Sequence, residues 1–333
     1  MSKNGAKALR RDLAESFCEA EKNGQCLVAR SESEAHRLRA AARRGLLVSP
    51  ASRVYARPEQ WDELGAAEKS LHVIRALSSL HPDWTFCHVS AALVHGLSVS
   101  NRLLGSAHVA ARKDRSRAGR GVTRHAIRND DLELVGGVRV TSLARTVLDC
   151  AREAGFRDAL ALVDSALRVS GLSKEELARR VRQVGRHVRG CERVCAIVEL
   201  GDARAESGGE SIARAVMYEL GFMQPDLQVR VADEVDGGEP YRVDFAWELP
   251  GGGVVYGELD GREKYRNPSM TGGRDVVDVL ADERLRESRM GVAGAKVMRF
   301  SFGDVVDKKR FAHLLRTYGI PEGYPVPDVV RKG

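Results

Sequence analysis

The spacing of apolar residues predicts helices and a hairpin in the first part of the chain. Residues 5–22 have apolar residues at helical spacing, and an Asn-Gly pair follows them. A second helix is expected next, capped by Ser31 or Ser33, with Glu34 three positions after Ser31 as in a capping box, and it should end at Gly45. Two short apolar segments within residues 46–57 then predict a hairpin.

The middle of the chain is mostly helical in pattern. Residues 61–82 have the amphipathic spacing of one helix that closes before Pro82. Residues 132–153 predict a Gly-Gly hairpin followed by a helix, and residues 156–200 are again helical. The stretch 201–211, GDARAESGGES, is typical of a linker, so we expect a domain boundary near residue 201.

The last part of the chain predicts a β-hairpin that carries carboxylates. After a strand at residues 226–231, the runs YRVDFAW and VVYGELD flank the turn LPGGG. If residues 249–253 form the loop, residue 248 faces 254, Asp244 faces Glu258, and Arg242 faces Asp260. Period two then puts Asp244, Glu258 and Asp260 on one face of the hairpin.

Opposed carboxylates destabilise a strand pair unless something neutralises them. A Mg²⁺ ion (or Mn²⁺) held by two carboxylates and waters would do so, and it could polarise a phosphodiester. The alternative is that Arg242 and Lys264 neutralise the acids and no metal binds. A helix is expected between Gly209 and Gly221, and Glu210 lies in its first turn. A carboxylate there suits the helix dipole in either case.

Composition fits a soluble, globular, cytoplasmic protein. The 333 residues are 43% hydrophobic and 30% charged, which allows two or three domains with buried cores. No apolar run has the length of a membrane span, and we expect no signal peptide. The six cysteines form no CxxC, so we expect neither a zinc site nor a disulfide framework. His88 and His95 lie seven apart, and helix packing explains them more simply than a metal does.

Charge is divided unevenly along the chain. Residues 1–200 hold 34 Lys and Arg against 23 Asp and Glu, a net charge of +11, whereas residues 201–333 hold 19 against 23, a net charge of −4. A basic first part suggests a polyanionic partner, although a GC-rich genome would also explain the many arginines.

The order helix, helix, hairpin is the outline of a winged-helix module, in which a helix enters the major groove and a wing touches phosphates. Candidate DNA-binding residues are Arg37, Arg39, Arg43 and Arg44 in the helix and Arg53 in the hairpin. The alternative is a solvated basic helix.

The C-terminal part resembles the restriction-endonuclease-like PD-(D/E)xK superfamily, and more closely the branch related to very-short-patch repair endonucleases. The resemblance runs over residues 206–316 through GESIARAVMYELGF, YRVDFAW, VVYGELDGREKY and AKVMRFSFGDV. It implies that Glu210, Asp244 and Glu258 bind the metal. Asp260 stands where the superfamily usually has Lys, so Lys264 is the candidate to assist the water. The resemblance also implies a helix at residues 275–290, where Arg286 would contact phosphate or remain a surface residue.

Residues 25–200 resemble the AbiEi-type antitoxin and transcriptional regulator family of bacterial type IV toxin–antitoxin systems. The resemblance rests on RRGLLVSPASRVYAR, CHVSAALVHGL and TSLARTVLDCAR. It implies a winged-helix DNA-binding domain joined to a second domain, repression of the protein's own operon, and a cognate toxin as partner.

The expected organisation is therefore a winged-helix-like module at residues 1–60, an AbiEi-like α+β domain at 61–200, and an α/β endonuclease-like domain with a central mixed sheet flanked by helices at 201–333. We expect a DNA-binding regulator that carries a nuclease-type domain. Whether that domain is a Mg²⁺-dependent endonuclease or a non-catalytic binding domain is left open. No membrane association and no small-molecule cofactor are indicated.

Overall fold

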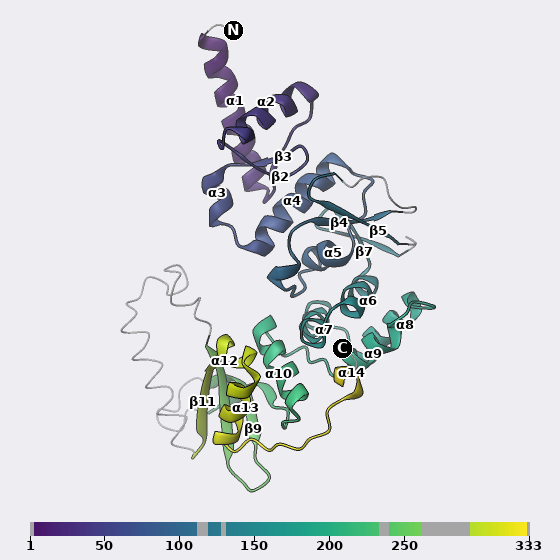
Figure 1. Cartoon of the computed structure of the whole chain (residues 1–333), viewed down its shortest axis with the longest axis vertical. Coiled ribbons are helices and arrows are strands. Elements are labelled where there is room, and N and C mark those ends of the chain that lie inside the picture. Colours follow the sequence, from purple (N-terminus) through teal and green to yellow (C-terminus); the bar gives the residue numbers. More distant parts are fainter. Residues whose placement is uncertain (1–2, 112–118, 128–130, 233–239, 261–293, 332–333) are drawn as a thin grey trace, which may run out of the picture. The chain divides into compact units, whose positions relative to one another are not determined.

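The computed structural model describes residues 3–111, 119–127, 131–232, 240–260 and 294–331, with side chains from residue 13 onward. The chain divides into two compact units. The first comprises Met1–Glu153 with Leu177–Val194, and the second comprises Ala154–Glu176 with Cys195–Gly333 (Figure 1). No structural observation tests the domain boundaries predicted at residues 60 and 200, and these stay predictions.

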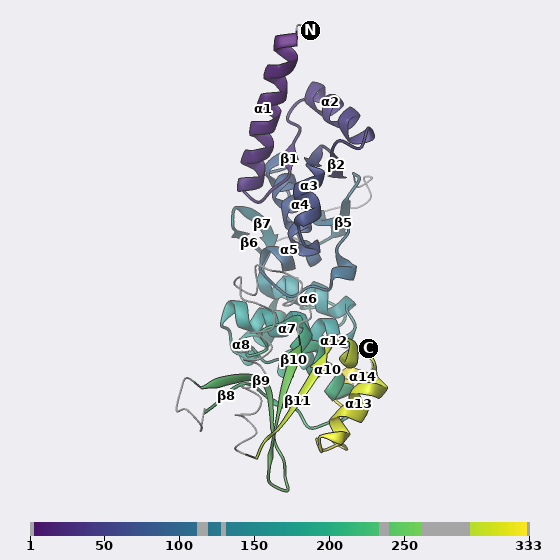
Figure 2. The same ribbon diagram turned by 90° about the vertical axis from the view of Figure 1, so that its left-hand side faces the viewer.

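The first unit begins with a small helix–sheet module. Its elements in chain order are α1 (Lys3–Lys22), β1 (Leu27–Val28), α2 (Glu32–Arg43), β2 (Val48–Ala51) and β3 (Val54–Ala56) (Figure 2). The three strands form an antiparallel sheet in the order β1-β3-β2. Phe17 of α1, Leu38 of α2 and Tyr55 of β3 are buried together in one core cluster. The two predicted helices and the hairpin are therefore present, and β1 adds a third strand.

Local capping explains where α2 begins. The Ser31 hydroxyl accepts the Glu34 backbone N–H at 3.1 Å, as the sequence predicts. The Glu34 carboxylate reaches back to the N–H of Arg30 at 2.9 Å, one residue before the cap.

The prediction of a single helix over residues 61–82 is wrong: the segment is divided into α3 (Pro58–Glu63) and α4 (Ala66–Leu80). Gly65 has extended backbone and serves as the N-cap of α4, which separates the two.

The rest of the first unit joins short strands to helices. Two parallel strands, β4 (Ala107–Ala111) and β5 (Val122–Ala126), pair with each other. The Gly-Gly hairpin is confirmed as β6 (Leu132–Val135) and β7 (Val138–Thr141). The helices of this part are α5 (His88–Val94), α6 (Leu143–Glu153) and α8 (Lys174–Val184), with a 3-10 turn, η1 (Asn101–Leu103), and α9 (Cys191–Glu199), which continues into the second unit.

The second unit is built on a mixed four-stranded sheet. Its strands are β8 (Asp226–Val231), β9 (Tyr241–Glu248), β10 (Val254–Asp260) and β11 (Lys296–Ser301). The order is β11-β10-β9-β8, with β10 and β11 parallel and the other pairs antiparallel. The helices are α7 (Phe156–Ser170), α10 (Gly208–Leu220), α12 (Phe302–Val306), α13 (Lys308–Thr317) and α14 (Asp328–Arg331). Residues of α10, α12 and α13 share one core cluster with residues of the sheet (Figure 2). The mixed sheet with flanking helices is thus confirmed at this level.

The predicted register of the β9–β10 hairpin is confirmed for residues 245–248 and 254–257, where the pairing stops one step short of Asp244 and Glu258. Glu248 pairs with Val254, Trp247 with Val255, and Phe245 with Gly257, so 249–253 is the loop. Trp247 is buried, and its indole N–H donates to the Met223 carbonyl at 3.0 Å. A Cβ at Gly257 would lie 2.9 Å from the Trp247 ring, so only glycine fits beneath this side chain.

None of the helices that the structure describes combines the length and apolar character needed to cross a lipid bilayer.

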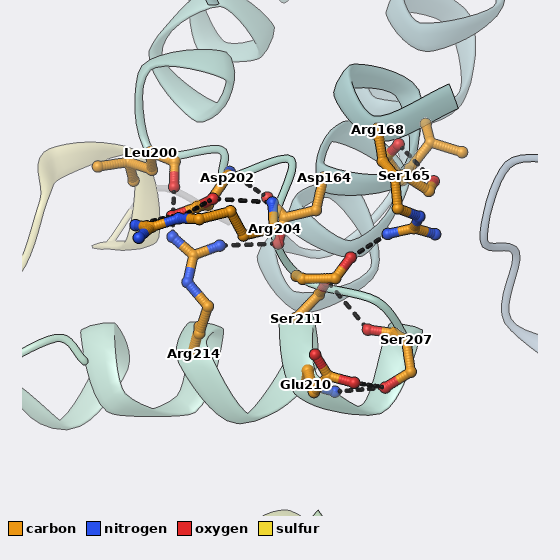
Figure 3. A network of polar contacts seen from close by, with 12 residues as sticks. Asp164, Ser165, Arg168, Leu200, Asp202, Arg204, Ser207, Glu210, Ser211 and Arg214 are labelled. Atoms are coloured by element: carbon orange, nitrogen blue, oxygen red, sulfur yellow. Dashed lines mark hydrogen bonds and ion pairs between the residues drawn. The ribbon is translucent and has the colours of Figure 1, made fainter. Parts of the chain in front are cut away.

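A buried ion pair ties α10 to α7 in the second unit. The Arg214 guanidinium lies 2.7 Å from Asp164, and both side chains are at most 5% exposed (Figure 3). Arg214 also donates to the Leu200 carbonyl at 2.9 Å, and Asp164 accepts the Asp202 backbone N–H at 2.7 Å. Arg168, one helical turn after Asp164, donates to the Ala205 carbonyl.

Three histidines and a cysteine gather in the first unit. The His88 ring stacks on His125 with centroids 3.7 Å apart, and the His108 Nδ1 lies 2.8 Å from the His125 Nε2. Burial first, and the neighbouring imidazoles second, lower the pKa of His88 and of His108 from 6.5 to about 4. His95, which the sequence placed beside His88, instead contacts the Thr141 carbonyl at 2.9 Å.

We predict that Arg214→Ala lowers the free energy of unfolding of the second unit by about 3–5 kcal/mol, because it leaves the Asp164 carboxylate buried without its cation. Chemical denaturation followed by circular dichroism measures this. The matched control is Arg204→Ala, which removes a half-exposed guanidinium paired with Asp202 and should cost at most about 1 kcal/mol. Equal losses in the two variants would contradict the assignment.

We also predict that the first unit loses stability as the pH falls from 7 to 5. In the unfolded chain His88 and His108 take up a proton near pH 6.5, whereas in the folded chain they do so only near pH 4. The unfolded state therefore binds more protons between pH 7 and pH 5. Each such histidine then accounts for about 2 kcal/mol between pH 7 and pH 5. In unfolding titrations at the two pH values, His108→Gln should reduce the difference by about this amount. The control His36→Gln, at an exposed position of the same unit, should leave the difference unchanged, and an unchanged difference in His108→Gln would refute the prediction.

Candidate functional site

The exposed surface of α2 carries four arginines without an acidic partner among the described residues. They are Arg37, Arg39 and Arg43 within the helix and Arg44 at its C-cap. Ala35 and Leu38 point the opposite way, into the core of the module. A guanidinium left in water retains its full capacity to bind a phosphate or a base edge. The helix therefore offers a cationic surface fixed on a packed framework.

The hairpin arginines are engaged within the protein. Arg53, the turn residue between β2 and β3, donates to the Glu32 carboxylate at 2.8 Å and to the Ala29 carbonyl at 3.0 Å. Arg57 forms a two-pronged contact with Glu21 of α1, and this contact raises the pKa of the arginine. Each of these hairpin cations must give up an internal contact before it can bind an external anion.

Glu210 caps its own helix. Ser207 is the N-cap of α10, and its hydroxyl accepts the Glu210 N–H at 3.1 Å while donating to the Glu210 carboxylate at 2.7 Å. The same carboxylate accepts the Glu206 N–H at 2.9 Å and the Gln228 side-chain amide at 3.0 Å. Burial raises the pKa of Glu210, and the Asp244 carboxylate nearby also raises it. Glu210 and Asp244 therefore lie close enough for their charges to interact.

Asp244 lies where the β9–β10 pairing stops. The last paired residues are Phe245 and Gly257, and one further step would set Asp244 opposite Glu258. There the Asp244 carboxylate accepts the Leu259 backbone N–H at 2.9 Å. On its other side, Gln228 of β8 lies between two pairs that flank Asp244, and its backbone is left-handed at φ 53°. A backbone distortion of this kind is costly for a residue other than glycine, and it accompanies functional sites in many proteins.

Glu258 is neutralised from the neighbouring strand. It pairs in register with Arg299 of β11, whose guanidinium lies 3.1 Å from the Glu258 carboxylate. Asp260 is the last residue of β10 and pairs with Ser301. Arg242, which the sequence set against Asp260, makes a bidentate contact with Glu206 at 2.7 and 2.8 Å. Lys264 and Arg286 lie outside the described residues, as does the helix expected at 275–290.

The predicted carboxylates do not converge as a set of three. Among the described residues, the group of three or more possible ligands with donor atoms within 4.8 Å of one another is Cys87, His88 and His125. The charges of Glu210 and Asp244 interact, whereas Glu258 forms an ion pair with Arg299. Sequence reasoning missed Gln228 and Arg299, because nothing in a single strand shows which residue of the next strand stands beside it. The position of Arg299 in an apolar run, KVMRFS, is the available signal, since a lone charge there calls for a partner.

Comparison with known proteins extends over the middle of the chain. Residues 85–200 match the family model of the AbiEi antitoxin C-terminal domain. Two curated relatives are "Uncharacterized protein MT2308" of Mycobacterium tuberculosis strain CDC 1551 / Oshkosh and "Uncharacterized protein Rv2248" of strain ATCC 25618 / H37Rv. Each is 35% identical over 162 residues, which is 48% of this chain and 58% of the relative. No solved structure matches the chain.

The family match confirms the AbiEi-type part of the resemblance for residues 85–200. It ends before Glu210 and the β9–β10 hairpin, so the nuclease-type part has no counterpart in this comparison. The chain spans less than two thirds of the length of the curated relatives it matches.

Proposed function

We propose that this chain is a DNA-binding regulator of the antitoxin type found in bacterial type IV toxin–antitoxin systems, and that α2 is its DNA-contacting helix. The observation that carries the proposal is the set of four exposed α2 arginines that lack an acidic partner among the described residues. The family match at residues 85–200 supports the antitoxin assignment, and a cognate toxin is the second expected partner.

The charge distribution along α2 suggests how the helix meets DNA. Glu32 and Glu34 occupy its first turn, whereas the arginines follow from residue 37 to residue 44. The acidic first turn would repel phosphates, so we expect the C-terminal half of the helix to approach the duplex. Contacts made from this half, without the helix N-terminus in the major groove, favour phosphate binding over base reading.

We predict that the double variant Arg39→Ala/Arg43→Ala binds duplex DNA at least about tenfold more weakly than the wild type in 100 mM salt. Each lost phosphate contact should also reduce the slope of log K against log salt by about 1. Fluorescence anisotropy with a labelled duplex, repeated at several salt concentrations, measures both quantities.

The matched control is Arg186→Ala/Arg189→Ala, which removes the same charge from an exposed turn elsewhere in the first unit. This variant should bind like the wild type. Equal weakening of the two double variants would mean that net charge alone attracts DNA, and that α2 is a solvated basic helix.

We propose as a second candidate that the C-terminal unit is a metal-dependent endonuclease of the PD-(D/E)xK type. The interaction of the Asp244 and Glu210 charges supports it, together with the mixed sheet and the confirmed hairpin register. The carboxylates of Glu210, Asp244 and Glu258 are ligands of the kind that Mg²⁺ or Mn²⁺ prefers, but they are not free to bind one. Arg299 already holds Glu258, and protein N–H and O–H groups already use oxygens of Glu210 and Asp244. The alternative, a non-catalytic domain that binds DNA or a partner, needs no such rearrangement.

The endonuclease candidate predicts that the wild type with Mn²⁺ or Mg²⁺ nicks supercoiled DNA, and that Asp244→Asn lowers the rate at least about 100-fold while DNA affinity is unchanged. Gel assays of supercoiled and linear DNA measure the cleavage. Asp226→Asn, at the exposed start of β8, is the control and should cleave like the wild type. If the wild type fails to cleave, or if Asp244→Asn cleaves equally, the non-catalytic alternative holds.

A further inference from the structure

The cluster of Cys87, His88 and His125 has the composition of a transition-metal site. One donor atom from each residue lies within 4.8 Å of the others. The three residues come from two places, the start of α5 and the end of β5, so the fold brings them together across the first unit. A thiolate with two imidazoles suits Zn²⁺ and similar ions, whereas Mg²⁺ and Ca²⁺ prefer oxygen ligands.

His88 is the residue that the apoprotein leaves unsatisfied. Its side chain is 5% exposed, and both ring nitrogens are buried without a hydrogen-bond partner. The Glu153 carboxylate lies 3.8 Å from the His88 Nε2, beyond hydrogen-bond distance. A buried polar atom left unpaired is destabilising, and a bound metal would satisfy one of these nitrogens.

The backbone at His88 is also strained in a way that fixes the ring. His88 follows the N-cap Cys87 and has φ 48°, in the left-handed region that favours glycine. A histidine in this region is strained and persists only where the surroundings impose the conformation. The Cys87 N–H donates to the His108 carbonyl at 3.0 Å, which anchors this corner against β4.

One of the two tautomer arrangements of the His125–His108 pair leaves His125 with a ring nitrogen for a metal. If the His125 Nε2–H donates to the His108 Nδ1 at 2.8 Å, then the His108 Nε2–H can donate to the Ser106 hydroxyl at 3.4 Å. Ser106 in turn contacts the Thr123 hydroxyl at 2.7 Å. This arrangement leaves the Nδ1 of His125 with a lone pair. Metal-binding histidines usually donate their second ring N–H in the same way, so His108 is the orienting partner of His125.

We propose that Cys87, His88 and His125 bind a Zn²⁺-class cation, with a fourth position taken by water or by the Glu153 carboxylate. In a tetrahedral site with such ligands, donor atoms lie about 3.3–3.8 Å apart. The His88 and His125 rings are stacked with centroids 3.7 Å apart, so binding requires these rings to turn until their nitrogen lone pairs converge on the ion. Binding replaces the Cys87 S–H proton by the metal and releases that proton to solvent. The site would lock α5 to β5, because its ligands join these two elements.

The test uses Co²⁺ as a spectroscopic probe on the full chain, freed of metal with a chelator. We expect one equivalent of Co²⁺ to bind, with a thiolate-to-cobalt charge-transfer band, and Zn²⁺ to displace it. Cys87→Ser should abolish the band, and His125→Ala should weaken binding at least tenfold. The controls Cys18→Ser and His36→Ala, which change an exposed thiol and an exposed imidazole, should behave like the wild type.

X-ray absorption at the zinc edge on the wild-type protein keeps the test independent of variant folding. We expect one sulfur and two imidazole nitrogens around the ion. A shell of oxygen and nitrogen alone, a stoichiometric titration with no thiolate band, or a band that survives in folded Cys87→Ser would overturn the proposal.

Discussion

The pairing of charge decides what this molecule can bind. A guanidinium or carboxylate that already has a partner must surrender it before it takes a ligand, and the penalty grows with burial. Asp164 and Arg214 represent one limit, where two fully buried charges hold α10 against α7. The arginines of α2 represent the other limit, since they lie in water on the surface of a packed helix. The sites that remain available for function follow from this division.

The same division changes the roles of residues that look equivalent in the sequence. Arg53 and Arg39 are both candidate DNA contacts by composition, but Arg53 is held by Glu32 and the Ala29 carbonyl. Glu258 and Asp244 are both candidate metal ligands, but Glu258 is held by Arg299. The basic helix therefore meets the requirement for polyanion binding directly. The carboxylate hairpin meets the requirement for metal binding only after its internal contacts are rearranged.

Much of the local structure could be predicted from the sequence. The Ser31 cap, the Gly-Gly hairpin and the register of the β9–β10 hairpin each depend on a few neighbouring residues, and all three are confirmed. Contacts between distant segments could not be predicted. Asp164 finds Arg214 fifty residues away, and no periodicity in either helix indicates that pairing. The division of the helix at Gly65 was also missed, because the apolar spacing continues across the break.

The histidine cluster shows the same limit most clearly. His88 and His95 share a helical spacing, which favours a helix-packing interpretation, while His108 and His125 lie on two separate strands. Only the parallel pairing of β4 with β5, and the placement of α5 beside β4, bring His88, His108 and His125 into contact. The expectation of no zinc site rested on the absence of a CxxC motif. The fold instead gathers possible ligands from distant positions, since His125 lies 37 residues after His88 in the sequence.

The central claim is that the uncommitted arginines of α2 contact nucleic acid. Arginine-specific labelling with phenylglyoxal, read residue by residue by mass spectrometry with and without duplex DNA, tests it most directly. The account predicts that DNA shields Arg37, Arg39, Arg43 and Arg44, while Arg53 and Arg57 react slowly in both conditions because acids already hold them. Shielding confined to other arginines, with the α2 residues reacting equally in both conditions, would contradict it.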